Sequence, residues 1–139
     1  FKVEADIWSC TSFNQLKRDG DDVSRWNLLH PDKKPKMSHV EKCLLDTDGP
    51  VVAATDYVKL FADQIRAYVP RSYSVLGTDG FGRSDSRQAL RKHFEVDRYY
   101  IAVASLNALM EDGSVSFKTV NGAIKKYGID PNKNNPLMS

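Results

Sequence analysis

Residues 51–77, VVAATDYVKLFADQIRAYVPRSYSVLG, contain the pattern that decides the fold. Segment 50–55 is apolar and β-branched, and segment 73–77 is mainly apolar and ends in glycine, as short buried strands do. Thr55 can cap a helix between them, and Pro70 can end it. Apolar residues recur there at the spacing of one helical face: Val58, Phe61, Ala62, Ile65 and Val69. The stretch therefore predicts a strand–helix–strand unit with parallel strands.

The chain before this unit predicts a third strand and several helices. Residues 5–11, ADIWSCT, have the composition of a buried strand. Residues 12–31 predict two short helices that are separated at Gly20, and residues 36–45 predict a further helical stretch. Lysine and proline crowd segment 30–36, HPDKKPK, which predicts an exposed connector.

The chain after the unit predicts three helices, over residues 87–94, 97–112 and 116–128. Gly113 and Gly128 are expected to end the last two, and the tail from Ile129 should fray unless it docks. The middle helix carries one apolar stripe, formed by Tyr99, Val103, Leu106 and Met110. The whole pattern predicts an α/β fold in a single domain over residues 1–139, a three-layer α/β/α arrangement around a small, mostly parallel (mixed) sheet.

The composition of the chain argues against some classes of binding partner. The 139 residues carry a net charge of only +2 and no basic block, which argues against nucleic acid or a membrane surface as the partner. No apolar run approaches the roughly 18 residues that a membrane span needs. Cys10 and Cys43 have no metal or redox spacing, which favours free cytosolic thiols.

The most distinctive loop is GTDGFGRSDSR, residues 77–87, which follows a predicted strand and precedes a predicted helix. Ligands of open α/β sheets bind at such positions, and Arg83, Arg87 and Arg91 recur every four residues, so an anion site is reasonable. The spacing matches neither of the common phosphate-binding fingerprints, however. Six residues are the candidate interface or anion contacts: Asp79, Phe81, Arg83, Ser84, Asp85 and Arg87.

A structural turn explains the same loop more simply. Its glycines can adopt the conformations of a tight turn, and Phe81 can tuck beneath it as a plug. Asp85 makes a good N-cap for the next helix, and Gln88, three residues later, completes a capping box. We therefore favour a strand-to-helix turn that meets another domain over a phosphate site.

No catalytic set can be assembled from the remaining candidates. The three histidines, His30, His39 and His93, have no metal spacing and no identifiable partner. Ser84 and Ser86 lack the nucleophile-elbow motif. The other candidates are typical of a loop or of core and interface anchors: Asp46, Asp48, Trp8 and Trp26. The residues alone favour a binding or interface domain.

Several long stretches together resemble one family: residues 6–20, 25–31, 51–70, 76–87 and 93–106. They are similar to the C-terminal domain of the homodimeric, bacterial-type pyruvate dehydrogenase decarboxylase component, in the transketolase superfamily. The resemblance implies a cytoplasmic enzyme that decarboxylates pyruvate on thiamine diphosphate with Mg²⁺. The same enzyme would then acetylate the lipoyl group of a partner acyltransferase. The cofactor and metal sites lie in the upstream domains, so no catalytic, cofactor or metal residue is expected in this chain.

The resemblance also implies a structural role for this domain. We expect it to pack against the upstream domains of the same chain within a homodimer, and to be inert alone. A strand and a helix precede the position of Phe1 in the family, so the chain is expected to be N-terminally truncated. The alternative is an autonomous anion- or phosphate-binding module that uses the loop from Gly77 to Arg87.

Overall fold

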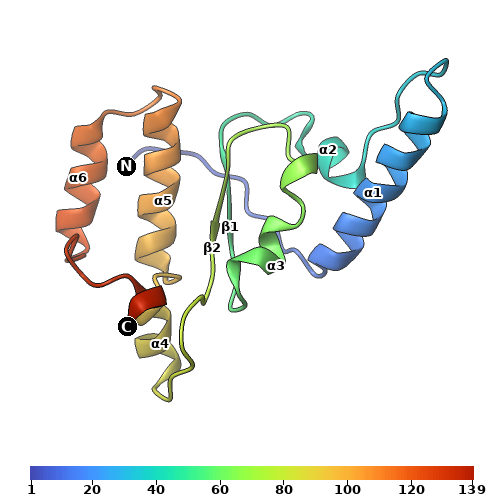
Figure 1. Ribbon diagram of the computed structural model, residues 1–139. Coiled ribbons are helices and arrows are strands. Elements are labelled where there is room, and N and C mark those ends of the chain that lie inside the picture. Colours follow the sequence, from blue (N-terminus) through green and yellow to red (C-terminus); the bar gives the residue numbers. More distant parts are fainter. The chain divides into compact units, whose positions relative to one another are not determined.

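A computed structural model describes all 139 residues, Phe1–Ser139. The fold is α/β, with six α-helices, two short 3-10 helices and one two-stranded parallel sheet (Figure 1). The chain forms two compact units. Unit 1 comprises Phe1–Asp48 and Asp63–Pro70, and unit 2 comprises Gly49–Ala62 and Arg71–Ser139. None of the helices is both long and apolar enough to cross a membrane.

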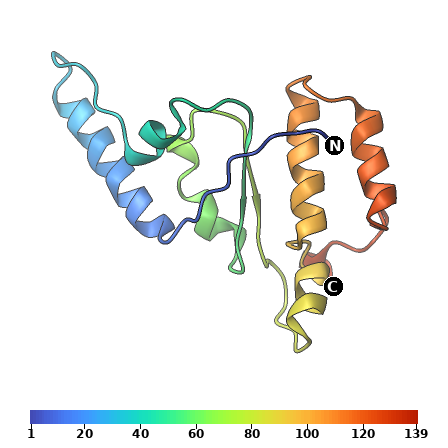
Figure 2. The same cartoon turned by 180° about the vertical axis from the view of Figure 1, so that it is seen from behind.

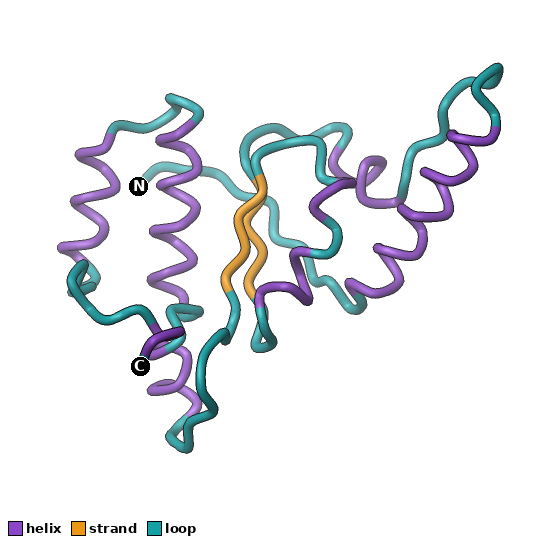
Figure 3. Tube along the Cα trace, in the orientation of Figure 1, coloured by secondary structure: helices purple, strands orange, loops and turns teal.

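The parallel strand pair is the centre of unit 2. Strand β1 (Val51–Ala54) pairs with β2 (Tyr73–Leu76) from Val51 opposite Tyr73 to Ala54 opposite Leu76. Helix α5 (Arg98–Glu111) packs on the pair, and α3 (Lys59–Asp63) lies on the opposite side (Figures 1 and 2). The two strands run side by side in Figure 3. The two parallel strands of the predicted strand–helix–strand unit are thus confirmed.

Helices α5 and α6 form an apolar contact within unit 2. Helix α6 (Phe117–Lys126) packs along α5, with Leu106, Val120 and Ala123 buried between them. Gly113 and Gly128 follow the two helices with φ values of +85° and +62°, the left-handed conformation that glycine adopts most easily. The predicted ends of both helices are therefore confirmed. Three residues of the predicted stripe, Val103, Leu106 and Met110, belong to this cluster.

The tail docks rather than frays. Lys133 Nζ donates to the carbonyl oxygen of His93 at 2.6 Å and to Oε1 of Glu95 at 2.9 Å. Beyond it, the 3-10 helix η2 (Pro136–Met138) begins with a buried proline. These contacts hold the tail beside the end of α4 (Arg87–His93).

Unit 1 is built on one long helix, α1 (Phe13–Leu29), which continues through Gly20. The expected break at Gly20 is wrong: this glycine is buried, and a Cβ there would lie 2.3 Å from the Tyr68 ring. Tyr68 belongs to the 3-10 helix η1 (Arg66–Tyr68), and its hydroxyl donates to Asp21. Gly20 is therefore a contact point for an aromatic ring, which the sequence pattern alone does not distinguish from a helix breaker.

The connector 30–36 folds back on the end of α1. Asn27 accepts from the Lys36 amide at 2.8 Å and donates to the Lys36 carbonyl at 2.9 Å. The Trp26 and His30 rings stack with their centroids 4.4 Å apart, and Lys36 Nζ lies 3.9 Å from the centroid of the Trp26 ring. Helix α2 (His39–Leu44) follows, and its N-cap Ser38 forms a capping box with Glu41.

Two further sequence-based predictions are wrong. Residues 5–11 are exposed and belong to no strand, because a strand needs a neighbour with which to form its ladder. The helix expected within 56–69 is divided into α3 and η1, with Asp63–Pro70 belonging to unit 1 and the preceding residues to unit 2. Ala62, Ile65 and Val69 are nevertheless buried, as their spacing predicted.

Candidate functional site

The loop Gly77–Arg87 begins where β2 ends, and its first residues are bound to the turn before α3. The Thr78 amide donates to the Tyr57 carbonyl at 2.8 Å, and its hydroxyl donates to the Asp56 carbonyl at 3.1 Å. Gly77 is buried in this contact, and a Cβ there would lie 2.6 Å from the Lys59 nitrogen and 2.7 Å from the Tyr57 oxygen. Only glycine lets the two backbone segments approach this closely.

Asp79 has a local structural partner. Its Oδ2 accepts from the Lys59 amide at 2.8 Å, at the first residue of α3. A carboxylate in this position satisfies a free amide of the helix and interacts favourably with the positive end of its dipole. Asp79 therefore joins the loop to α3.

Gly80 marks where the loop meets the tail. Its φ is +131°, a conformation that other residues rarely adopt, and a Cβ there would lie 2.5 Å from the Pro136 carbonyl oxygen. The tail thus supports the loop from one side. The sequence pattern does not predict this contact, because Gly80 and Pro136 lie 56 residues apart in the chain.

The outer half of the loop is open to solvent. Phe81 is 74% exposed, so the expected plug beneath the turn is wrong. Ser84 is exposed, and Asp85 is exposed with Oδ1 accepting from the Ser86 amide at 2.7 Å. The N-cap of α4 is Ser86, which accepts from Ala89, so the expected capping box of Asp85 with Gln88 is wrong.

Arg83 turns toward His93. One guanidinium nitrogen lies 2.9 Å from Nδ1 and 3.2 Å from Nε2 of the ring, which can accept only through a neutral nitrogen. Desolvation lowers the pKa of His93, and the positive charges of Arg83 and Lys133 lower it further. Both observations agree on a neutral His93 beside a charged Arg83.

Arg87 faces another way, toward the turn after β1. It approaches Asp56 at 3.4 Å, and Arg91, one turn later on α4, approaches the other oxygen of Asp56 at 3.8 Å. The structure therefore divides the six candidate residues. Asp79 serves α3, Arg83 pairs with His93, and Arg87 joins an arginine cluster on α4, whereas Phe81, Ser84 and Asp85 form the exposed rim.

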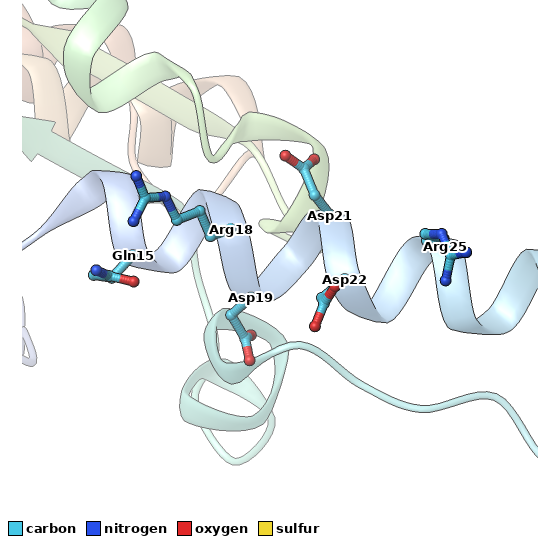
Figure 4. Close-up of a pocket in the computed structure, with 6 residues that line it drawn as sticks. All are labelled: Gln15, Arg18, Asp19, Asp21, Asp22 and Arg25. Carbon is cyan, nitrogen blue, oxygen red and sulfur yellow. The ribbon is translucent and has the colours of Figure 1, made fainter.

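The charged face of α1 in unit 1 is a second candidate, with a shallow depression of about 510 Å³ along it (Figure 4). Its carboxylates do not converge: Asp21 points away from Asp19 and Asp22. Asp19 accepts from the His39 amide at 2.5 Å, and Asp21 accepts from Lys17 and Tyr68. These groups connect the elements of unit 1 and form no reactive set.

No group of three or more histidine, cysteine or acidic side chains could hold a metal ion. The structure does place Cys43 Sγ 3.3 Å from His39 Nε2, a pair that sequence reasoning missed. Their spacing of four residues on one short helix is the signal that could have found it. No third group orients the imidazole, so the pair lacks a feature of an activated nucleophile.

Comparison with known families decides the identity of the domain. Residues 1–97, which include unit 1, the strand pair and α4, match the family described as transketolase-like TK C-terminal domain. The chain belongs to this family. Helices α5 and α6 of this transketolase-type C-terminal domain lie beyond the matched residues.

Curated relatives of this transketolase-type domain extend the match over the whole chain. It is 59% identical over 138 residues to the pyruvate dehydrogenase E1 component of Pseudomonas aeruginosa, covering 99% of this chain and 16% of that protein. The corresponding protein of Cupriavidus necator is 58% identical over 135 residues, with coverages of 97% and 15%. That of Escherichia coli K12 is 51% identical along the entire chain and 16% of its own length. The chain thus spans about one sixth of these relatives.

Proposed function

We propose that this chain is the C-terminal domain of a thiamine-diphosphate-dependent pyruvate dehydrogenase (acetyl-transferring). That enzyme would decarboxylate pyruvate and acetylate the lipoyl group of a partner acyltransferase. The observation that carries the proposal is the identity of 51–59% along the whole chain to proteins named pyruvate dehydrogenase E1 component. A resemblance of this length and level exceeds what one shared fold produces.

Within that enzyme, the role proposed for this domain is assembly. Its loop from Gly77 uses Thr78, Asp79 and Arg83 for internal bonds, which leaves few polar groups for chemistry. Large apolar side chains remain uncovered in unit 2, as expected of surfaces that pack against other domains: Tyr57, Val58, Leu60 and Phe81. The proposed partners are the upstream domains of the same chain, a second copy in a homodimer and the lipoyl acyltransferase component.

The cofactor is assigned to the rest of the enzyme. The residues of this chain include no group of three or more histidine, cysteine or acidic side chains that could hold a metal ion. From the relationship to the pyruvate dehydrogenase E1 components, we propose that thiamine diphosphate and Mg²⁺ bind the upstream domains, that residues 1–139 are one inert domain, and that the enzyme is cytoplasmic.

Two measurements on the full-length protein test this proposal. The first is pyruvate-dependent decarboxylation with thiamine diphosphate and Mg²⁺, whose absence in a folded, cofactor-loaded protein would refute the enzymatic assignment. The second is the dimer dissociation constant by analytical ultracentrifugation for Phe81→Ser, with Ser84→Ala in the same loop as the control. We expect Phe81→Ser to weaken association or to loosen the domain, because the surface that packs on Phe81 would lose the apolar contact of its ring. Unchanged dissociation and unchanged hydrogen exchange of the loop would remove Phe81 from the interface.

The alternative, an autonomous anion-binding module that uses Gly77–Arg87, stays a prediction. Its separate test is calorimetric titration of the protein with phosphate ligands, in which Arg83→Ala should abolish binding. The pairing of Arg83 with His93 makes this residue a weaker anion ligand than the sequence suggested.

A further inference from the structure

Three arginines of unit 2 surround a depression between α4 and the start of α5. Arg87 and Arg91 come from α4, Arg98 is the first residue of α5, and Tyr99 and Ile101 form the apolar side. Its volume is about 520 Å³, and it is open to solvent. This surface is distinct from the tip of the loop, where Phe81 and Ser84 lie.

The two carboxylates near the depression do not neutralise all of the positive charge of its three arginines. Asp97 is committed as the N-cap of α5, since its Oδ1 accepts from the Tyr99 and Tyr100 amides at 2.8 and 3.0 Å. Asp56 lies 3.4 Å from Arg87 and 3.8 Å from Arg91. Both distances exceed those of close charge-assisted hydrogen bonds, which are about 2.7–2.9 Å. Three guanidinium groups therefore share two carboxylates, neither of which binds any of them closely.

The arginines differ in what they can offer a ligand. Arg91 is held in place by a bond of 3.2 Å to the Val96 carbonyl, and its buried Nε has no hydrogen-bond partner. Arg98 is oriented by Tyr99, because it donates to the hydroxyl at 2.8 Å and lies 4.8 Å from the ring centroid. Arg87 is 79% exposed with its single long contact to Asp56, so most of its five donors are available.

The apolar side of the depression is also held in place. The Tyr99 ring packs against Tyr127 of the neighbouring helix segment, with centroids 4.8 Å apart. An ordered aromatic ring beside oriented guanidinium groups suits a ligand that has both a dianionic and an organic part. Guanidinium groups bind phosphate oxygens bidentately, which favours phosphate over a monoanion.

We propose that this depression binds an organic phosphate monoester. Its phosphate contacts Arg87 and Arg98, Arg91 adds positive charge, and its organic group lies against Tyr99 and Ile101. The amides at the start of α5 take no part, because Asp97 already occupies them. The proposed site thus uses Arg87 and Arg98 in place of Arg83, and the sequence pattern had not grouped these two residues.

The experiment is arginine modification by phenylglyoxal, read by peptide mass mapping of the full-length protein with its cofactor site loaded. The probe is phenyl phosphate, and inorganic phosphate is the comparison. At a tenfold excess over its Kd, phenyl phosphate should slow modification of Arg87 and Arg98 by roughly tenfold. The exposed Arg18 on α1 should react at the same rate with and without the probe.

Direct binding of phenyl phosphate to variants supplies the second measurement. Arg98→Gln should weaken it by roughly tenfold or more, because a charged hydrogen bond is lost. Arg18→Gln should leave binding unchanged. Weakening by Arg83→Gln but not by Arg98→Gln would overturn the proposal in favour of the loop. Failure of phenylglyoxal to reach Arg87 and Arg98 without ligand would overturn it as well, since another part of the protein would then cover the depression. Equal affinity for inorganic phosphate would refute the role of Tyr99.

Discussion

Replacing Gly77 by alanine tests whether the close approach of two backbone segments holds the loop in place. The added Cβ would lie 2.6 Å from the Lys59 nitrogen, a distance that backbone atoms do not tolerate. The segments would have to separate, and two bonds of 2.8 Å would be lost or lengthened: Thr78 N to Tyr57 O, and Lys59 N to Asp79 Oδ2. A neutral hydrogen bond contributes about 1 kcal/mol and one to a carboxylate about 1.5–3 kcal/mol, so the expected cost is about 2–4 kcal/mol.

Native-state hydrogen exchange measures this loss of stability in individual segments of the chain. In peptides that cover residues 55–62 and 75–82, protection of the amides should fall roughly 30- to 1,000-fold, since each 1.4 kcal/mol is about tenfold. Gly82→Ala is the matched control, because a Cβ at Gly82 meets nothing within 4 Å. That control should be neutral or stabilise by up to about 1 kcal/mol. Equal protection in the two variants would refute the argument from close approach.

Three further perturbations address the tail and two titrating groups. Lys133→Met should release the tail and make its cleavage by a protease roughly 10- to 100-fold faster, because bonds to the His93 carbonyl and Glu95 are lost. Burial and positive neighbours lower the pKa of His93 from 6.5, so its contribution to stability is complete above that pH and is lost as the pH falls through the lowered pKa. His93→Gln should therefore flatten the dependence of the melting temperature on pH between about 7 and 5. The pKa of the Asp21 carboxyl, which is lowered by Lys17 first and Tyr68 second, should rise more in Lys17→Met than in Tyr68→Phe when followed by NMR titration.

Each of these predictions has an outcome that would contradict it. Lys118→Met on the exposed side of α6 should leave tail cleavage unchanged, and equal cleavage in both lysine variants would contradict the docking role of Lys133. For His93, an unchanged pH profile in the glutamine variant would show that another group titrates. For Asp21, a larger rise in Tyr68→Phe would show that the hydroxyl rather than the ammonium sets the pKa.

The local patterns of the sequence predicted much of unit 2. The strands lie within the predicted segments 50–55 and 73–77, and the apolar stripe from Val103 to Met110 forms the contact with α6. Such features depend on the period of apolar residues and on glycine chemistry, which neighbouring residues determine. The family resemblance, stated on runs of residues rather than on a motif, likewise agrees with the match over residues 1–97.

Three of the errors have a common origin in contacts between distant residues. Gly20 looked like a helix breaker because its partner, the Tyr68 ring, lies 48 positions later. Segment 5–11 has the composition of a strand, yet composition does not supply the neighbouring strand. The arginine depression was missed for the same reason, since Arg98 follows a turn whose direction the sequence does not specify.

The close approach of Gly80 to the Pro136 carbonyl oxygen has a consequence for biosynthesis. Pro136 is added to the growing chain 56 residues after Gly80. At about 5–20 residues per second, translation takes roughly 3 to 11 s to cover that distance. During this interval the strand pair can already form, while the glycine-rich loop lacks the support of the tail. A nascent chain would therefore expose this loop to proteases and chaperones for seconds, and ribosome pausing before the codon for Pro136 should lengthen that exposure.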